Sequence, residues 1–443
     1  MEEFEIIIRN IFHLVAEYGI TNKPLDFRFP EKITEKEKEE FLIQVHKGFR
    51  LGQEQIIKEI LPLLRQQEKL KLAEKEAKQA KNKNELAKIG EEKGLIAYKV
   101  QLLRHFADFI AWQVFKNDYY KARRFYSGNR TRPDLLNSNL ESVLAAVNAF
   151  HSEDERNFAL ITDLTSFVDI GDIILQKTDG TYIIECKSGK VQQRVFEFIE
   201  EIEKDEFDAK KVDYSDKNHN FFDQVERTLN QIKKGSRAIE FLKKEEGIDP
   251  FSETKINVFE AAKPREYYFK YLFDLIEQSK KNDSSYGEVE EVIYIGIYRN
   301  TKIPPSGFVF KYIVDKIYEK SVIVDYLNIL NLPLKEPLFF KPFGSEVIFD
   351  LMFGRLKIFA AINLDKFIEL FNQKGIDAKW MNRKETQKLL DSKNKYKPFM
   401  FKRQAIKITV NGKALTLGDS FIIYLLLDNI TPSSLVERYH GFK

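Results

Sequence analysis

One stretch of the chain, GDIILQKTDGTYIIECKSGK (171–190), contains three side chains whose types and spacing could bind a metal ion. Side chains alternate along a strand, so Glu185 and Lys187 share one face while Cys186 points to the other. The turn KTDG can bring Asp172 opposite them. Two carboxylates with one lysine would hold a hard divalent cation and bind a water or phosphate oxygen beside it. These residues therefore predict a site of phosphodiester hydrolysis.

The acid-x-Lys triplet by itself is common in this chain. The same pattern begins at Glu76, Glu91, Asp208, Glu253, Asp377 and Asp391. Only Glu185 ends an apolar run, follows a TDG turn and has an aspartate on the preceding apolar run. The alternative is an ordinary hairpin whose Asp, Glu and Lys are solvated charges.

This hairpin resembles the D-x(n)-(D/E)-x-K hairpin of the PD-(D/E)xK nuclease superfamily, which has a restriction-endonuclease-like fold. The resemblance is limited to the hairpin region. It implies that Asp172 and Glu185 bind Mg²⁺, with Mn²⁺ able to substitute, and that the Cys186 carbonyl is a further ligand. It also implies that Lys187 positions the attacking water. Gly171 stands where the family name has proline, and a glycine there allows close backbone approach.

Two further site residues are expected from the resemblance. Family members often add an acid from the preceding helix, here Glu141 on the helix 139–150 as a metal ligand. The alternative is a capping box in which Glu141 bonds back to the backbone of Ser138. Gln224 resembles a glutamine that some members place beside the lysine, although Thr228 replaces their tyrosine, and an exposed helical glutamine fits equally well.

One nearby acid is predicted to lie outside this site. Asp169 is three residues before Asp172, so strand alternation sends it to the opposite face, where it would cap or pair elsewhere.

A basic and aromatic stretch, YYKARRFYSGNRTRPD (119–134), precedes the predicted core. Guanidinium groups neutralise phosphates and aromatic rings stack on unpaired bases. Arg123, Arg124, Arg130 and Arg132 are therefore candidate nucleic-acid contacts. The alternative is a basic helix end with its aromatic residues in the core.

Hydrophobic periodicity predicts a mixed α/β fold. Helical patterns occupy the chain up to residue 125, with an expected break near Pro62. Three short apolar runs between 158 and 187 predict three strands, the last two as a hairpin. Helices are expected at 191–208 and 221–243, a buried strand at 292–298, and a type I′ hairpin at Asn411-Gly412.

These elements predict three regions. Residues 1–129 form a helical N-terminal region, 130–300 a restriction-endonuclease-like αβββαβ core, and 301–443 a C-terminal α/β region for recognition or assembly. The boundary at 301–308, TKIPPSGF, contains a Pro-Pro-Ser-Gly run that continues neither a helix nor a central strand.

Composition limits the class of protein. The 71 Lys and Arg residues against 68 Asp and Glu leave a net charge of +3, so no global cationic field exists. Cys186 is the sole cysteine, which excludes an internal disulfide framework and a cysteine-based zinc site. No long uncharged apolar run is present, so we expect no membrane partner. The acidic N-terminus lacks the features of an export signal, and a cytoplasmic location is expected.

Together these features predict a Mg²⁺-dependent nuclease. DNA is favoured over RNA by the resemblance alone, which also suggests a restriction or antiphage setting. A homo-oligomer or a partner protein of a defence system is compatible with the sequence. Two alternatives stay open: a non-catalytic nucleic-acid-binding or assembly subunit with a nuclease-like core, and an RNA-cleaving toxin.

Overall fold

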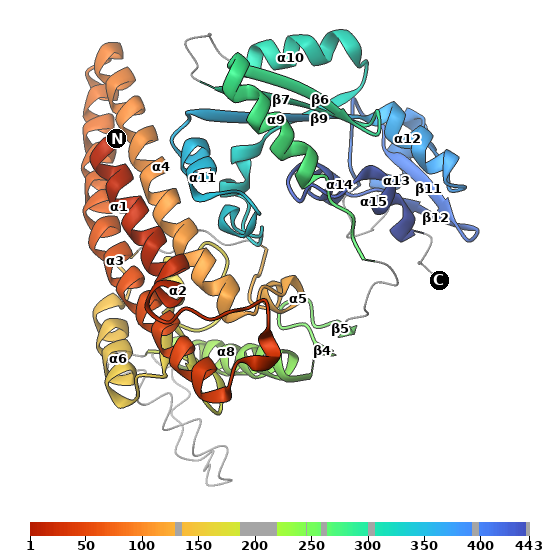
Figure 1. The fold of residues 1–443 in the computed structure, drawn as a ribbon. Coiled ribbons are helices and arrows are strands. Elements are labelled where there is room, and N and C mark those ends of the chain that lie inside the picture. Colours follow the sequence, from red (N-terminus) through yellow and green to blue (C-terminus); the bar gives the residue numbers. More distant parts are fainter. Residues whose placement is uncertain are drawn as a thin grey trace. The chain divides into compact units, whose positions relative to one another are not determined.

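The chain divides into two compact units, which are coloured along the sequence in Figure 1. The first unit is Met1–Val258 with Leu330–Pro337, and the second is Phe259–Ile329 with Leu338–Lys443. A computed structural model describes residues 1–128, 135–186, 219–244, 246–257, 264–299, 306–391 and 398–439.

The first unit begins with a bundle of helices. They are α1 (Glu2–Phe12), α2 (Tyr18–Asn22), α3 (Glu35–Gln79), α4 (Lys83–Val114) and α5 (Tyr119–Arg123). α3 and α4 form a long hairpin beside α1 (Figure 1). Thr34 and Glu37 form a capping box at the start of α3. The predicted break at Pro62 is wrong, because α3 continues through it and the hairpin turns at residues 80–82 instead.

A three-stranded antiparallel sheet follows the helix α6 (Leu140–Glu153). Its strands are β1 (Phe158–Ile161), β2 (Ile173–Lys177) and β3 (Gly180–Ile184), in the order β1-β2-β3. The three predicted strands and their hairpin are confirmed. β1 ends at Ile161 because a 3₁₀-helix, Thr162–Leu164, begins directly after it.

The outer edge of β1 is covered by a side chain of α3. The Gln53 amide donates to the Ala159 carbonyl at 3.1 Å and accepts from the Ile161 N–H at 2.9 Å. Gln53 is only 3% exposed. This amide therefore satisfies backbone groups that a fourth strand would otherwise pair with.

The helix α8 (His219–Lys244) packs against β3, where Gly235 lies close to Ile183. The hairpin β4 (Glu246–Ile248) and β5 (Lys255–Asn257) follows it. The predicted helix at 221–243 is confirmed, and the one at 191–208 lies outside the described residues.

The second unit contains two antiparallel sheets. One sheet has four strands in the order β6-β7-β9-β8, and the other has three strands in the order β10-β11-β12. The strands are β6 (Ser284–Val289), β7 (Ile293–Arg299), β8 (Ser321–Asp325), β9 (Leu356–Asn363), β10 (Asp377–Trp380), β11 (Ile406–Val410) and β12 (Lys413–Thr416). The helices are α9 (Phe269–Asn282), α10 (Ser306–Ile317), α11 (Ser345–Met352), α12 (Leu364–Gln373), α13 (Arg383–Asp391), α14 (Ser420–Leu426) and α15 (Pro432–Tyr439).

Aromatic residues fill the space between α10 and the four-stranded sheet. Phe310 of α10 is fully buried against Tyr294 and Phe359, with ring centroids 5.8 and 5.7 Å away. Gly296 of β7 allows this approach, since a Cβ there would lie 2.5 Å from the Phe310 ring. This cluster is the core of that face of the sheet.

The buried strand predicted at 292–298 exists as β7, but its neighbours differ from the expected ones. β7 pairs with β6 and β9 in the second unit. The structure therefore corrects the αβββαβ core, whose last strand was expected beside the first three. A buried apolar run shows that a strand is covered on both faces, but it carries no information on which strands pair with it.

The predicted region boundaries lie differently from the observed units. The boundary after residue 129 falls inside the first unit, and the boundary after residue 300 falls inside the second. The helical N-terminal region packs on β1 through α3, which explains why it shares a unit with the three-stranded sheet.

Candidate active site

Asp172 and Glu185 lie opposite each other at the ends of two adjacent strands. The paired residues of β2 and β3 end at Ile173 and Ile184. The Asp172 N–H donates to the Ile184 carbonyl at 2.9 Å, so Asp172 and Ile173 both lie against Ile184. Asp172 directly precedes the last paired residue of β2 and Glu185 directly follows that of β3, so the hairpin brings both acids to one end of the sheet.

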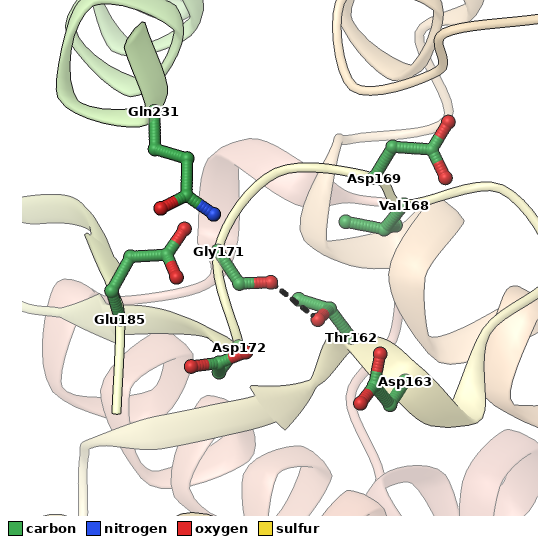
Figure 2. A pocket seen from close by; sticks show the side chains of 8 residues that line it. All are labelled: Thr162, Asp163, Val168, Asp169, Gly171, Asp172, Glu185 and Gln231. Carbon is green, nitrogen blue, oxygen red and sulfur yellow. Dashed lines mark hydrogen bonds between the residues drawn. The ribbon is translucent and has the colours of Figure 1, made fainter. Parts of the chain in front are cut away.

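Both acids line an open pocket of about 190 Å³ (Figure 2). The pocket is lined by Thr162, Asp163, Val168, Asp169, Gly171, Asp172, Glu185 and Gln231. Four of these eight residues carry carboxylates. Typical pockets for small organic ligands hold roughly 300–1,000 Å³, so this one suits a hydrated cation or a phosphate group rather than a whole nucleotide.

The backbone of Cys186 orients the Asp172 carboxylate. The Cys186 N–H donates to Asp172 Oδ2 at 2.6 Å, and the Cys186 carbonyl accepts from Asn139 Nδ2 at 2.7 Å. Hydrogen bonds to an ionised acceptor are short and strong, so they hold the carboxylate plane in place. A carbonyl oxygen has two lone pairs, and the predicted role of the Cys186 carbonyl as a ligand is compatible with its bond to Asn139.

The Cys186 thiol is half-buried, and the strand alternation expected at this residue does not apply to it. β3 ends at Ile184, so strand alternation does not extend to residue 186. Burial raises the pKa of the thiol, and the charges of Asp172 and Glu185 raise the pKa further. The thiol is therefore a poorer nucleophile at neutral pH than a free cysteine.

Gly171 has a conformation that other residues adopt poorly. Its φ is +74°, and a Cβ would lie 2.4 Å from Ile183 Cγ2. Its carbonyl accepts a hydrogen bond from Thr162 Oγ1 at 2.6 Å (Figure 2). Proline, with φ fixed near −65°, cannot adopt this conformation, whereas glycine can.

Gln231 of α8 is a pocket residue that the sequence did not identify. Figure 2 shows its amide and the Glu185 carboxylate pointing toward one another. The predicted Gln224 lies on the same helix seven residues earlier, and its side chain is outside the described residues. Seven residues are about two helical turns, so both glutamines share one helix face, and periodicity alone cannot choose between them.

Two aspartates reach the pocket from the loop after β1. Asp163 belongs to the 3₁₀-helix and has no spacing signal in the sequence. Asp169 does bond elsewhere, as predicted, because its Oδ2 accepts from the Ser127 N–H at 2.7 Å. It nevertheless lines the pocket wall, and its carboxylate points away from Glu185 (Figure 2).

The two remaining residues predicted for the metal site are Lys187 and Glu141. Lys187 lies outside the described residues. Glu141 is exposed in the first turn of α6 and is not among the described residues that line the pocket. The predicted capping box is wrong, because Asn139 is the N-cap and the Ser138 hydroxyl donates to the Leu135 carbonyl.

The predicted nucleic-acid contacts separate into different environments. Arg124 is 6% exposed and pairs with Asp249, with its guanidinium 5.1 Å from the Phe241 ring centre. A buried, paired guanidinium is not accessible to a phosphate, so the structure corrects the assignment of Arg124. Arg123 is half-buried and donates to the Tyr126 carbonyl, while Arg130 and Arg132 lie outside the described residues.

The donor set of the pocket fits a hard cation. No group of three or more His, Cys, Asp or Glu side chains has metal-binding geometry in the described part of the chain. Mg²⁺ commonly uses one or two protein carboxylates and takes its other oxygens from water and substrate phosphates. Asp172 and Glu185 in the pocket lining, and the Cys186 carbonyl beside it, are oxygen donors of that kind.

Comparisons with known proteins identify no relative. No protein-family model, curated protein or solved structure matches the chain. None of the helices in the described ranges is long and apolar enough to cross a membrane. The function must therefore be inferred from the residues and their geometry.

Proposed function

We propose that this protein is a Mg²⁺-dependent nuclease whose metal is held by Asp172 and Glu185. The observation that carries the proposal is their opposed position at the ends of β2 and β3, beside a pocket with two further carboxylates. The helix–three strands–helix order around this hairpin also supports it, since it resembles the first part of the superfamily core.

The bound Mg²⁺ would act as a Lewis acid on a phosphate oxygen and increase the acidity of a water. Asp172 presents its carboxylate in an orientation fixed by the Cys186 N–H. Gln231 has an amide that can donate to a phosphate oxygen or accept from a water. Lys187, two residues beyond Glu185, is the residue that the resemblance assigns to orienting that water.

The size of the pocket supports recognition of the sugar-phosphate backbone rather than of bases. A space of about 190 Å³ accommodates one phosphate with its cation. Phosphate contacts carry no sequence information, so any sequence preference would come from other surfaces. DNA is the favoured substrate on the basis of the resemblance.

The test uses the purified full-length protein with four substrates: supercoiled plasmid, linear duplex, single-stranded DNA and RNA. Each is incubated with Mg²⁺, Mn²⁺ or EDTA. We expect metal-dependent cleavage of a DNA substrate and its loss in Asp172→Asn, which keeps an acceptor for the Cys186 N–H. Glu76→Gln, in an exposed acid-x-Lys triplet of α3, is the matched control and should cleave normally.

The outcomes distinguish the alternatives. Cleavage of RNA alone would favour the toxin hypothesis. Binding of nucleic acid without cleavage under any metal condition would favour the non-catalytic subunit. Full activity of Asp172→Asn would contradict the assignment of the site.

A further inference from the structure

The loop between β1 and β2 builds most of the pocket. We name residues 162–171 the wall loop. Five of the eight pocket residues belong to it: Thr162, Asp163, Val168, Asp169 and Gly171. The shape of the pocket therefore depends on what holds this loop.

Part of the support is internal to the loop. The Thr165 N–H and hydroxyl both donate to the Thr162 carbonyl, at 2.9 and 2.7 Å. The Val168 N–H donates to Thr165 Oγ1 at 3.1 Å. Thr162 also donates its N–H to the Asp172 carbonyl at 3.1 Å, which links the loop directly to a proposed metal ligand.

The rest of the support comes from two charged side chains of α4. Arg104 Nη1 donates to the carbonyls of Asp163, Leu164 and Thr165, at 2.7, 3.3 and 3.3 Å. One turn later, Asp108 accepts from the N–H and the hydroxyl of Ser166, both at 2.6 Å. Four consecutive residues, 163–166, are thus bonded to one helix.

These two side chains are unusually buried for charged groups. Arg104 is 3% exposed and Asp108 is 8% exposed. Burial of a charge is costly unless hydrogen bonds and an opposite charge compensate it. The wall-loop backbone supplies those bonds, so the loop and α4 depend on each other for their polar partners.

We infer that Arg104 and Asp108 are positioning residues for the pocket, through which the N-terminal helical hairpin sets the conformation of the wall loop. Through the wall loop, Arg104 and Asp108 fix the positions of Asp163 and Asp169 in the pocket lining. The hydrogen bond from the Thr162 N–H extends this support to the backbone of Asp172. The catalytic consequence of this inference rests on the proposed nuclease function, whereas the structural part does not.

The chain supplies a matched control on the other long helix. Arg50 of α3 donates to the carbonyls of Asp154, Glu155 and Asn157, which precede β1. It repeats the chemistry of Arg104, one guanidinium on three carbonyls, at a loop that contributes no described residue to the pocket. Arg50 is less buried than Arg104, but the two Arg→Lys changes remove the same kind of guanidinium–carbonyl bonds, and only Arg104→Lys touches the wall loop.

The first measurement is hydrogen exchange of the full-length protein. In Arg104→Lys, the amides of residues 162–169 should exchange at least about tenfold faster than in the wild type, because the loop opens locally. In Arg50→Lys these amides should keep their wild-type rates. Asp108→Ala should repeat the Arg104→Lys result, while Asp108→Asn, which keeps an acceptor for the Ser166 N–H, should restore most of the protection.

The second measurement separates kcat from KM for cleavage. A displaced wall loop should lower kcat roughly tenfold or more with little change in KM, since misplacement of catalytic groups chiefly affects the chemical step. Arg50→Lys should lower the melting temperature of the protein without lowering kcat. Asp108→Ala and Asp108→Asn provide the same comparison if Arg104→Lys does not fold.

Two results would overturn the inference: unchanged exchange at residues 162–169 in both Arg104→Lys and Asp108→Ala, or equal losses of kcat in Arg50→Lys and Arg104→Lys. A wild type that cleaves none of the substrates would instead overturn the proposed function. Hydrogen exchange would still test whether Arg104 and Asp108 position the wall loop, because this measurement does not require an active enzyme.

Discussion

The sheets β1-β2-β3 and β6-β7-β9-β8 are both antiparallel, yet their side chains are distributed differently. In the first sheet, carboxylates gather where the pairing of β1, β2 and β3 ends and the wall loop departs. In the second, aromatic rings gather on the face covered by α10. The side chains that could take part in chemistry thus lie at the strand ends of the first sheet. The covered face of the second sheet is occupied by packed aromatic side chains.

Two tyrosines of the aromatic cluster that packs on the second sheet extend this contrast. Burial raises the pKa of both Tyr298 and Tyr318, so these phenols stay neutral over the physiological range. Tyr318 donates its hydroxyl proton to Glu288 at 2.7 Å. The Glu288 carboxylate of β6 therefore takes part in the packing of the aromatic cluster.

The largest expected effect comes from replacing Glu185, which follows β3, and is absent when Glu288 of β6 is replaced in the same way. Glu185→Gln should reduce the rate of metal-dependent cleavage by about a thousandfold, since it removes a charged ligand worth several kcal/mol in the transition state. Glu288→Gln should cleave at nearly the wild-type rate. Initial rates at saturating Mg²⁺ measure both, and a comparable loss in the two variants would remove the distinction between the sheets.

The second effect is on stability and concerns the aromatic cluster. Phe310→Ala should lower the free energy of unfolding of the second unit by about 3–5 kcal/mol, the usual cost of such a cavity. The protein has two tryptophans, Trp112 in the first unit and Trp380 in the second. Urea unfolding followed by Trp380 fluorescence in a Trp112→Phe background should report the loss.

The Phe310→Ala variant in a Trp380→Phe background, which keeps Trp112, can contradict the comparison. If Phe310→Ala lost cleavage activity while its first unit stayed folded by Trp112 fluorescence, the second unit would contribute to the chemistry after all. Leu415→Ala, at a partly exposed position of β12, is a control that should change little.

The third expected effect is a difference between the two units in how their stability depends on pH. Burial lowers the pKa of His46, His105 and His151 in the first unit to about 4, 3 and 4. The unfolded chain binds these protons near pH 6.5, so stability is fully present above that pH and falls as the pH drops toward the folded values. Each histidine can cost up to about 1.4 kcal/mol per pH unit in this window.

Urea unfolding at pH values of about 7, 6 and 5.5, which span the ordinary histidine pKa, tests this expectation. Trp112 should report a falling midpoint for the first unit, and Trp380 a nearly constant one for the second. His46→Gln should flatten the dependence of the first unit. Equal pH dependence of the two probes would contradict the prediction.

The smallest effect concerns the arginines of the basic stretch. If Arg130 and Arg132 bind nucleic acid, changing both to Gln should reduce the slope of log affinity against log salt by about one unit for each phosphate that is no longer neutralised. Arg124→Gln should instead destabilise the fold, because it leaves Asp249 buried without its partner. An unchanged salt slope in the double variant would favour a structural role for this stretch.

Local features of the fold could be predicted from the sequence with good success. The hairpin at Asn411-Gly412 is confirmed, with φ of +50° and +74° at the two turn residues. The hairpin containing Asp172 is also confirmed, since its apolar runs and TDG turn are specified by neighbouring residues. Strand alternation and turn chemistry depend on a few consecutive residues, which a single sequence contains.

Features that depend on distant residues could not be predicted. The neighbours of β7, the position of Gln231 in the pocket lining, and the burial of Arg124 against Asp249 all depend on how separate elements pack. Charge and aromatic content look the same in a phosphate-binding surface and in a buried ion pair. The position of Lys187 stays a prediction.

The amide of Gln53 on the outer edge of β1 has a consequence for self-association. An exposed strand edge is a template onto which another chain can add a strand, and such edges promote aggregation. Because Gln53 occupies the Ala159 carbonyl and the Ile161 N–H, this edge offers an incoming strand few backbone partners. A second copy of the chain therefore cannot extend the sheet across β1 without first displacing α3.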